Sequence, residues 1–449
     1  MQVRLLLAAG ILLIAGLESS AETLKEAMAA AEATNPQLDV QRKQLEISEE
    51  QLTSARGARL PTVEFTGSYG PETVQTNRAI VLDQGGRQIA TTQLQAVQPL
   101  YAGGRINAGI REARAGIGSS NAQLDVTTQN TLLDTITVYM DVLSDREAVK
   151  IQESSVNLLS EQFQAAQDRF DVGEITRTDV ALAEARLQGA RADLSFAEAQ
   201  SVASEATYRI IVGSEPDDLQ PPPPITELPS TFEEALEIAL DQNPDIRAAE
   251  FSQRAAEQRI TTARSRLRPE LNLVATAAFR GTLNQPDAPN FFGGDPNELI
   301  STPDFLDRNV SAFAQARIPL YQGGVARSQV RSAKLEKAQA ELNVENQRRQ
   351  TIAQVSQFWY AYQAAIVGIQ ASERQIQAAE IAFEGGQEEL AVGVRTTLDV
   401  LDQEQDLLEA RLSLVQAERD AYVAAHQLLR AMGTLTFERV DVYQPNDVN

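Results

Sequence analysis

The chain of 449 residues contains no cysteine and a single histidine, His426. Without cysteine it has no disulfides, thiolate metal sites or cysteine nucleophiles, and one histidine cannot build a multi-histidine zinc site. Neither glycine-rich phosphate-binding pattern, G-x-x-x-x-G-K or a G-x-G-x-x-G that follows a strand, occurs. We therefore expect no enzyme activity, no cofactor and no bound metal ion.

Basic residues and aromatic residues are also scarce. The 39 Lys and Arg residues face 62 Asp and Glu residues, which gives a net charge of −23. Nucleic-acid phosphates require a basic face, so this balance argues against a nucleic-acid partner. Aromatic residues make up 5% of the chain, which is low for a densely packed globular core.

Beyond Ala21 the chain has no apolar run of 18 residues. Residues 1–21 combine Arg4, an apolar stretch and a small-residue cleavage site, which is typical of a secretory signal peptide. A transmembrane anchor is the alternative, but the apolar stretch is shorter than the roughly 20 residues that a bilayer requires. No cysteine follows the cleavage site, so lipoprotein-type lipidation is excluded. If the mature chain crosses a membrane, it must do so with strands in a closed barrel.

The mature sequence consists of two copies of one unit. Asn35-Pro36 returns as Asn243-Pro244 at an offset of 208, and Pro99-Leu100-Tyr101 returns as Pro319-Leu320-Tyr321 at an offset of 220. The offset of 220 then holds to the end of the second copy. The predicted organisation is a signal peptide (1–21), a first repeat (22–213), a proline-rich linker (214–230), a second repeat (231–433) and a C-terminal tail (434–449).

Each repeat contains two segments in which apolar and polar residues alternate, as in strands with one apolar and one wet face. The predicted strands cover about 62–70 and 89–98 in the first repeat, and about 270–281 and 309–318 in the second. Long loops rich in Gly, Pro and Asp join each pair, so each repeat is expected to carry one β-hairpin.

The remainder of each repeat has the seven-residue apolar period of helices that supercoil against neighbours. The first repeat carries this period at Val142, Val149, Val156, Phe163 and Phe170, and the second at Tyr362, Ile369, Ile376, Phe383 and Leu390. A helix from about Gly104 to Phe170 would measure roughly 100 Å at 1.5 Å per residue. His426 lies within the second run of heptads, where a lone histidine is expected to be a packing residue.

The predicted fold class is therefore mostly α with a small β part: duplicated long coiled-coil helices and two β-hairpins. Four strands cannot close a barrel, but two, three or four identical chains would supply about 8, 12 or 16 strands. The expected assembly is a β-barrel continued by an α-helical tunnel. The alternative is a secreted coiled-coil protein with a structural or adhesive role and no pore.

The duplicated plan, the Pro-Leu-Tyr-x-Gly-Gly corners and the turns around Gly173 and Gly393 resemble the TolC family of outer-membrane channel proteins. The run Val392-Gly393-Val394-Arg395-Thr396 and its continuation to Asp402 carry the most specific part of this similarity. The resemblance implies a homotrimer with a 12-stranded barrel in outer-membrane lipid and a periplasmic helical tunnel. It also implies a periplasmic adaptor protein and an inner-membrane pump as partners, in efflux or type I secretion. The chain itself would be a passive duct.

Gly173 and Gly393 end the long heptad runs and are expected to take the left-handed conformation of a turn. The resemblance implies that the same two turns are where the adaptor docks. Thr176 to Asp179 and Thr396 to Asp399 each have the form of a capping box at a helix start.

Asp402 lies beyond its capping box, one helical turn after Asp399 and on the same face. Two like charges stacked in this way are locally unfavourable, which favours a functional reading. The resemblance implies that Asp399 and Asp402 form a ring of aspartates at the periplasmic entrance. It further implies that Arg395 latches the closed entrance, with Asp179 as the matching acid. Leu390 stands where the family often has tyrosine, so part of that latch network differs here.

Overall fold

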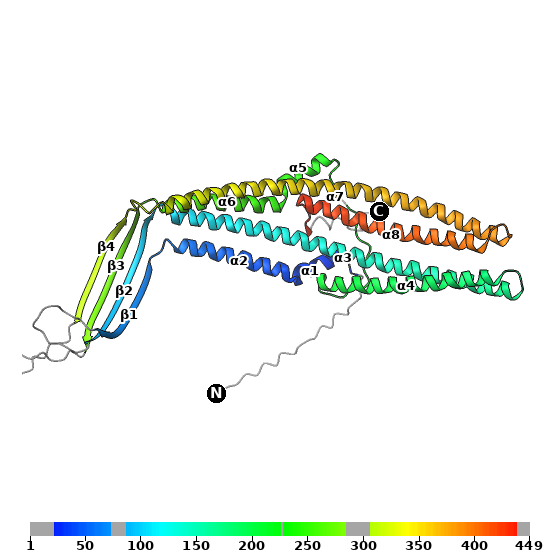
Figure 1. Cartoon of the computed structure of the whole chain (residues 1–449), viewed down its shortest axis with the longest axis horizontal. Helices are drawn as coiled ribbons and strands as arrows, with labels where there is room; N and C mark the ends of the chain where they lie inside the picture. Colours follow the sequence, from blue (N-terminus) through cyan, green and yellow to red (C-terminus); the bar gives the residue numbers. More distant parts are fainter. Residues whose placement is uncertain (1–21, 73–86, 226–227, 284–305, 438–449) are drawn as a thin grey trace, which may run out of the picture. The chain divides into compact units, whose positions relative to one another are not determined.

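The computed structural model describes residues 22–72, 87–225, 228–283 and 306–437 (Figure 1). The predicted signal peptide at 1–21, most of the two hairpin loops and most of the tail at 434–449 lie outside the described residues. The chain divides into two compact units. Unit 1 comprises Met1–Arg42, Ala122–Arg247 and Asn346–Asn449, and unit 2 comprises Lys43–Asn121 and Ala248–Glu345.

The elements occur in the same order in both halves of the chain: two short helices, two strands and two long helices. The first half contains α1 (Leu24–Thr34), α2 (Pro36–Gly57), β1 (Thr62–Glu72), β2 (Arg87–Ala102), α3 (Arg105–Asp171) and α4 (Arg177–Val212). The second half contains α5 (Phe232–Gln242), α6 (Pro244–Ser265), β3 (Glu270–Leu283), β4 (Leu306–Arg317), α7 (Val325–Ala391) and α8 (Thr397–Met432). Matching helices have equal lengths; α3 and α7, for example, each have 67 residues. No helix within the described part of the chain is both long and apolar enough to cross a membrane.

Capping residues and prolines set the bounds of the short helices. Thr23 and Glu26 form a capping box at the start of α1, and each of the breaks α1–α2 and α5–α6 is an Asn-Pro pair. Proline is favoured at the first position of a helix because its missing N–H would be unpaired there. Asn243 is buried at the second break, where its side chain donates to the carbonyl oxygen of Ala431 (2.8 Å) and accepts from the backbone N–H of Asp245 (2.9 Å).

The main core of unit 1 surrounds Tyr139, which is fully buried. Its hydroxyl lies 2.6 Å from the carbonyl oxygen of Gln220 and 2.9 Å from that of Glu22, so it joins α3 to the start of the first repeat and to the linker that follows it. His426 is also buried; its Nδ1 lies 2.8 Å from the carbonyl oxygen of Tyr422, and burial lowers its pKa. His426 is therefore a packing residue, as the sequence indicated.

In unit 2 the strands form one antiparallel sheet in the order β1-β2-β3-β4 (Figure 1). Phe65 of β1 faces Leu94 of β2, Leu94 faces Ala277 of β3, and Ala277 faces Val310 of β4. This register places the predicted apolar positions of all four strands on one face. Large side chains of that face are exposed: Val63 66%, Phe65 69%, Tyr69 69%, Leu94 46% and Val310 77%.

Gly433 provides a test of the junction between the two short helices of the second repeat and the end of α8. It has a φ of 77°, and a Cβ there would lie 2.6 Å from the Cα of Asn243. We expect Gly433→Ala to lower the free energy of unfolding by about 1–3 kcal/mol, through backbone strain and this clash. The measurement is urea-induced unfolding followed by helical circular dichroism. Gly189→Ala in α4 is the control, because a Cβ at Gly189 meets nothing within 4 Å; equal losses in both variants would contradict the packing argument.

Candidate functional site

The long helices of unit 1 are joined by two similar turns, tip 1 (residues 171–177, between α3 and α4) and tip 2 (residues 391–397, between α7 and α8). Gly173 and Gly393 have φ angles of 80° and 75°. In tip 1 the N–H of Gly173 donates to Phe170 O and that of Glu174 to Arg169 O, both at 2.9 Å; tip 2 repeats the pattern. Left-handed glycine closes such turns without a Cβ penalty, so the turn alone accounts for both glycines.

The helix that follows each tip starts with the predicted capping box. The Asp179 carboxylate accepts from the backbone N–H of Thr176 at 2.9 Å and from its hydroxyl at 2.8 Å. Asp399 accepts from the same two groups of Thr396 at 3.0 and 2.7 Å. These hydrogen bonds stabilise the ionised carboxylates and lower the pKa of both aspartates below the ordinary value.

Each tip also carries an internal ion pair. In tip 1 the basic residue comes first along the chain, and in tip 2 the acidic residue comes first. In tip 1 Arg169 Nε lies 3.3 Å from Glu174 Oε2, and in tip 2 Arg395 Nε lies 2.6 Å from Glu389 Oε2. Arg169 and Glu389 occupy matching positions in the two repeats. Both pairs brace a glycine turn against the end of the preceding helix.

Asp402 is paired with a residue of the other repeat. Its Oδ1 lies 2.5 Å from Arg186 Nη2, which joins α8 to α4. Two residues further on, the buried Glu404 accepts a hydrogen bond of 2.7 Å from the hydroxyl of Ser155 on α3. Burial raises the pKa of Glu404, an effect that this hydrogen bond and Arg186 oppose. Near the tips, α8 is thus bound to both long helices of the first repeat, α3 and α4.

The predicted site residues lie in the two tips and the opening turns of the helices that follow them, and the four charged ones each already have a partner. Asp399 and Asp402 lie one turn apart on α8; the first caps its helix and the second pairs with Arg186. Arg395 and Asp179 lie on different tips, and no ion pair joins them within the part of the chain that the structure describes. The latch between these two residues remains a prediction.

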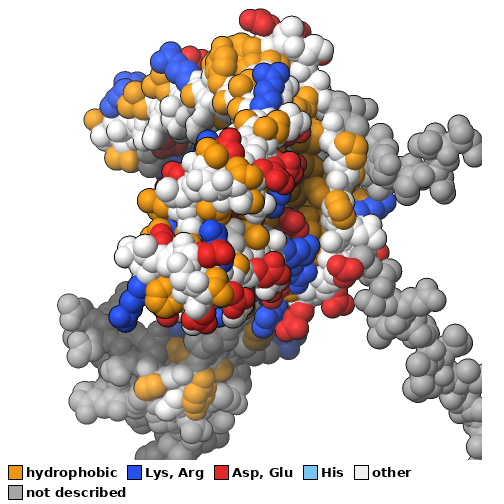
Figure 2. Space-filling view, turned by 90° about the vertical axis from the view of Figure 1, so that its right-hand side faces the viewer, with side chains coloured by type: hydrophobic (Ala, Val, Ile, Leu, Met, Phe, Trp, Pro, Cys, Tyr) orange, Lys and Arg blue, Asp and Glu red, His pale blue; other side chains and the backbone are white. Residues whose placement is uncertain are grey.

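The space between the tips is a shallow groove lined by both of them, with Arg169 and Ile175 on one side and Leu390 and Thr397 on the other. Three valines of the tips are largely exposed: Val172 at 72%, and Val392 and Val394 at 74% each. Viewed from this end of the chain, acidic and basic side chains are interspersed with hydrophobic ones (Figure 2). Within the described residues, no group of three His, Cys, Asp or Glu side chains could hold a metal ion.

Sequence reasoning missed Arg186, Glu389 and Ser155. Arg186 lies in the first repeat and Asp402 in the second, and nothing in a linear sequence indicates which of many arginines meets a given aspartate. The Glu389–Arg395 pair could have been predicted from the sequence, because a glycine turn brings the residues on its two sides together. In the first repeat, the opposite charges of Arg169 and Glu174 likewise lie on the two sides of a glycine turn, so this pair could have been predicted in the same way.

A family model described as outer membrane efflux protein matches residues 27–214 and 235–434. The chain belongs to this family. Two relatives are similar to it over nearly the whole chain. The outer membrane efflux protein BepC of Brucella suis is 32% identical over 98% of the chain and 94% of its own length, and the outer membrane protein TolC of Vibrio cholerae is 27% identical over 94% and 92%.

The fold agrees as well. The CmeC outer membrane channel of Campylobacter jejuni superposes with a TM-score of 0.76 over 92% of this chain and 85% of its own, at 16% identity. The predicted membership of the TolC family is confirmed, as is the mostly helical fold with a small sheet. The chain is thus an outer-membrane channel, in a family of channels rather than enzymes. The alternative of a secreted structural or adhesive coiled-coil protein finds no support.

The capping boxes predict a pH dependence of the tips. The folded-state pKa of Asp179 and Asp399 lies below the ordinary value of 3.8, so their capping contributes fully above pH 3.8 and is lost as the pH falls through the folded value. We expect hydrogen exchange of the first-turn amides of α4 and α8, corrected for intrinsic rates, to accelerate below pH 3.8. In Asp179→Ala/Asp399→Ala the exchange should already be fast at pH 7 and should change little with pH. A parent-like profile in this variant would contradict the capping role.

Proposed function

We propose that three copies of this chain form the exit duct of an efflux or type I secretion assembly. Their twelve strands would close a barrel in the outer membrane, and their long helices would continue it as a periplasmic tunnel. The observation that carries the proposal is the exposed apolar face, which runs across all four strands. An apolar surface of this kind is suited to lipid, whereas the opposite face, with residues such as Glu64, Gln93 and Thr276, is suited to a wet lumen.

The edges of the sheet support assembly from several copies. Within the described residues, β1 and β4 each pair with a strand on one side only. The opposite edges present backbone N–H and C=O groups that lipid cannot satisfy. Pairing β1 of one copy with β4 of the next would satisfy both edges and close the sheet. Family resemblance selects three copies among the closed arrangements that strand number allows.

The tips would dock a periplasmic adaptor, which in turn would connect the duct to an inner-membrane pump. The exposed Val172, Val392 and Val394 beside Gly173 and Gly393 offer an apolar surface of the kind that protein partners cover. The chain contains no nucleotide-binding motif, so transport energy would come from the pump. Selection of the cargo would then lie in the pump as well.

The entrance would be controlled by charge at the tips. Around a threefold axis, Asp399 and Asp402 would contribute about six carboxylates to the narrowest part of the lumen, and charged rings of this kind favour cations. Arg395 and Asp179 would help to hold the entrance closed through contacts between neighbouring hairpins. Because Arg395 already binds Glu389 in its own tip, the latch would add to that pair or exchange with it on assembly.

Single-channel conductance in a planar bilayer tests the duct and its latch together. The purified parent should form pores, and its mass in detergent should be that of three chains. Arg395→Ser should raise the conductance several-fold, because it removes both the pair with Glu389 and the latch. Glu389→Gln removes only the pair within tip 2 and should leave conductance near that of the parent. Equal conductances in the two variants would assign Arg395 to its own turn alone, and a correctly folded parent that forms no pores would refute the duct.

Block by multivalent cations tests the aspartate ring. Asp399→Asn/Asp402→Asn should abolish block and weaken cation selectivity, because the focused negative potential is lost. Arg186→Gln should have the opposite effect and strengthen block, since it removes the positive charge 2.5 Å from Asp402. The control Glu233→Gln/Glu234→Gln removes two charges in the first turn of α5 and should behave like the parent. Undiminished block in the aspartate variant would contradict the ring.

A further inference from the structure

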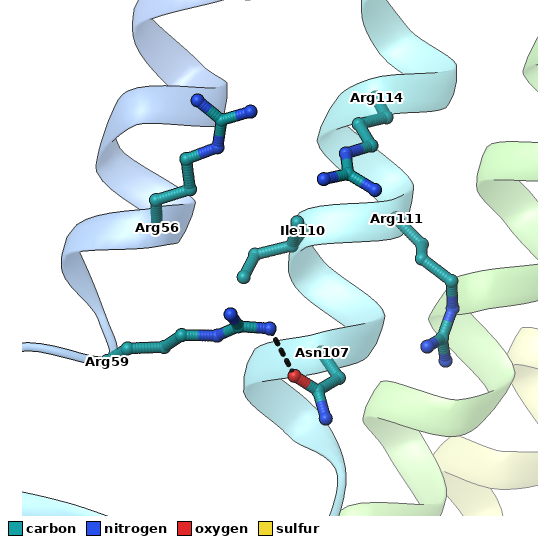
Figure 3. Close-up of a pocket in the computed structure, with 6 residues that line it drawn as sticks. All are labelled: Arg56, Arg59, Asn107, Ile110, Arg111 and Arg114. Atoms are coloured by element: carbon teal, nitrogen blue, oxygen red, sulfur yellow. Dashed lines mark hydrogen bonds between the residues drawn. The ribbon is translucent and has the colours of Figure 1, made fainter.

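Four arginines line a pocket in unit 2, beside the end of the sheet. Arg56 lies in the last turn of α2 and Arg59 just after it, while Arg111 and Arg114 lie near the start of α3. Arg56, Arg59 and Arg114 extend into the space between α2 and α3, whereas Arg111 turns toward α6 (Figure 3). All four arginines are exposed, so a ligand could reach them from outside the molecule.

Among the described residues, these arginines lack acidic partners. Arg59 Nη2 donates to Asn107 Oδ1 at 2.6 Å, and Arg111 Nε donates to Gln258 Oε1 at 2.7 Å. Both acceptors are neutral amides, and no described carboxylate lies within ion-pair distance of any of the four arginines. In a chain with a net charge of −23, a group of unneutralised arginines is unexpected. Their mutual repulsion is relieved when an anion binds among them.

The second repeat has basic residues at three of the four matching positions. The same two offsets that relate the repeats elsewhere relate Arg56 to Arg264, Arg111 to Arg331 and Arg114 to Lys334. None of these three residues forms an ion pair with a described carboxylate either. Basic charge at the junction of sheet and helices is therefore a property of both halves, although Leu267 replaces Arg59 in the second.

The pocket lies next to the strand ends. Arg59 precedes β1 by three residues, and its carbonyl oxygen accepts from Gln98 Nε2 of β2 at 2.7 Å, which holds it against the sheet. Asn107 and Arg114 are the third and tenth residues of α3, so they lie within about 14 Å of its start at 1.5 Å per residue. Lipid headgroups extend about 5–8 Å beyond the hydrocarbon on each side of a bilayer, and arginine side chains reach several ångströms toward them.

We propose that Arg56, Arg59 and Arg114 form a binding site for the phosphate group of an anionic phospholipid in the membrane leaflet nearest the helices. This assignment rests on the proposed crossing of the membrane by the strands. A guanidinium group presents two parallel N–H donors that match two phosphate oxygens, so three converging arginines can surround one phosphate. The neutral Asn107 orients Arg59 without competing for it as a carboxylate would. Bound lipid would fix the depth of the sheet in the membrane.

Native mass spectrometry of the detergent-purified protein, titrated with phosphatidylglycerol, tests the site. The parent should retain the lipid, and Arg56→Gln/Arg59→Gln/Arg114→Gln should bind it at least about tenfold more weakly. The control Arg177→Gln/Arg191→Gln/Arg374→Gln removes the same charge from exposed arginines of unit 1 and should bind like the parent. If the pocket variant does not assemble, Arg114→Gln alone should show at least about threefold weaker binding.

Two further probes separate the possible sources of the signal. Diacylglycerol with the same acyl chains lacks phosphate and should not be retained by this site, while inorganic phosphate alone should bind far more weakly than the lipid. Equal lipid binding by parent and pocket variant would overturn the proposal, and inorganic phosphate that binds as tightly as the lipid would overturn the lipid assignment. Pore formation by the pocket variant shows that its channel is intact, so loss of lipid binding and failure of the duct are distinguished.

Discussion

The unpaired backbone groups of β1 and β4 are the constraint on which the proposed assembly depends. Within the described residues, the four-stranded antiparallel sheet satisfies its interior hydrogen bonds but leaves one edge on each outer strand. Water can satisfy such groups, and hydrocarbon cannot. The sheet also exposes an apolar face across all four strands, and lipid is the environment that suits such a face. Lipid cannot, however, satisfy the unpaired backbone groups at the two edges of the sheet. Closure with further copies resolves this conflict.

In the two tips, the dominant interactions are local pairs of charges. Each tip is closed by a glycine turn, braced by one ion pair and followed by a helix with a capping box. Exposed ion pairs each contribute only about 0–1 kcal/mol, because water screens them and the side chains lose entropy. Weak, separable interactions would suit the entrance that we propose, which would have to open and reclose. The Arg186–Asp402 pair adds a connection between the two repeats, and it also neutralises an aspartate that the pore would present.

Duplication explains both the similarities and the differences between the halves. Helix lengths, turns and caps are kept, because each depends on backbone geometry that both repeats share. Charged positions differ: Arg169 of the first repeat corresponds to Glu389 of the second, and the uncharged Leu182 corresponds to Asp402. The Arg186–Asp402 pair, which joins α8 to α4, has no counterpart in the other repeat because Leu182 stands at the position that matches Asp402. In the trimer that we propose, a framework of six similar repeats would in this way acquire sites that occur only three times.

The sequence by itself determined the elements of this protein, because the signals for them are local. Seven-residue and two-residue apolar periods separated helices from strands, Gly173 and Gly393 marked the ends of two long helices, and the motif around Gly393 identified the family. Asp179 and Asp399 were correctly read as capping residues from their spacing to threonine. Only the tertiary structure decided which charges meet. Arg186 and Asp402 lie in different repeats, and the arginines of the pocket come from two helices separated by a hairpin. Such contacts depend on the register of long helices and strands, which no short stretch of sequence encodes.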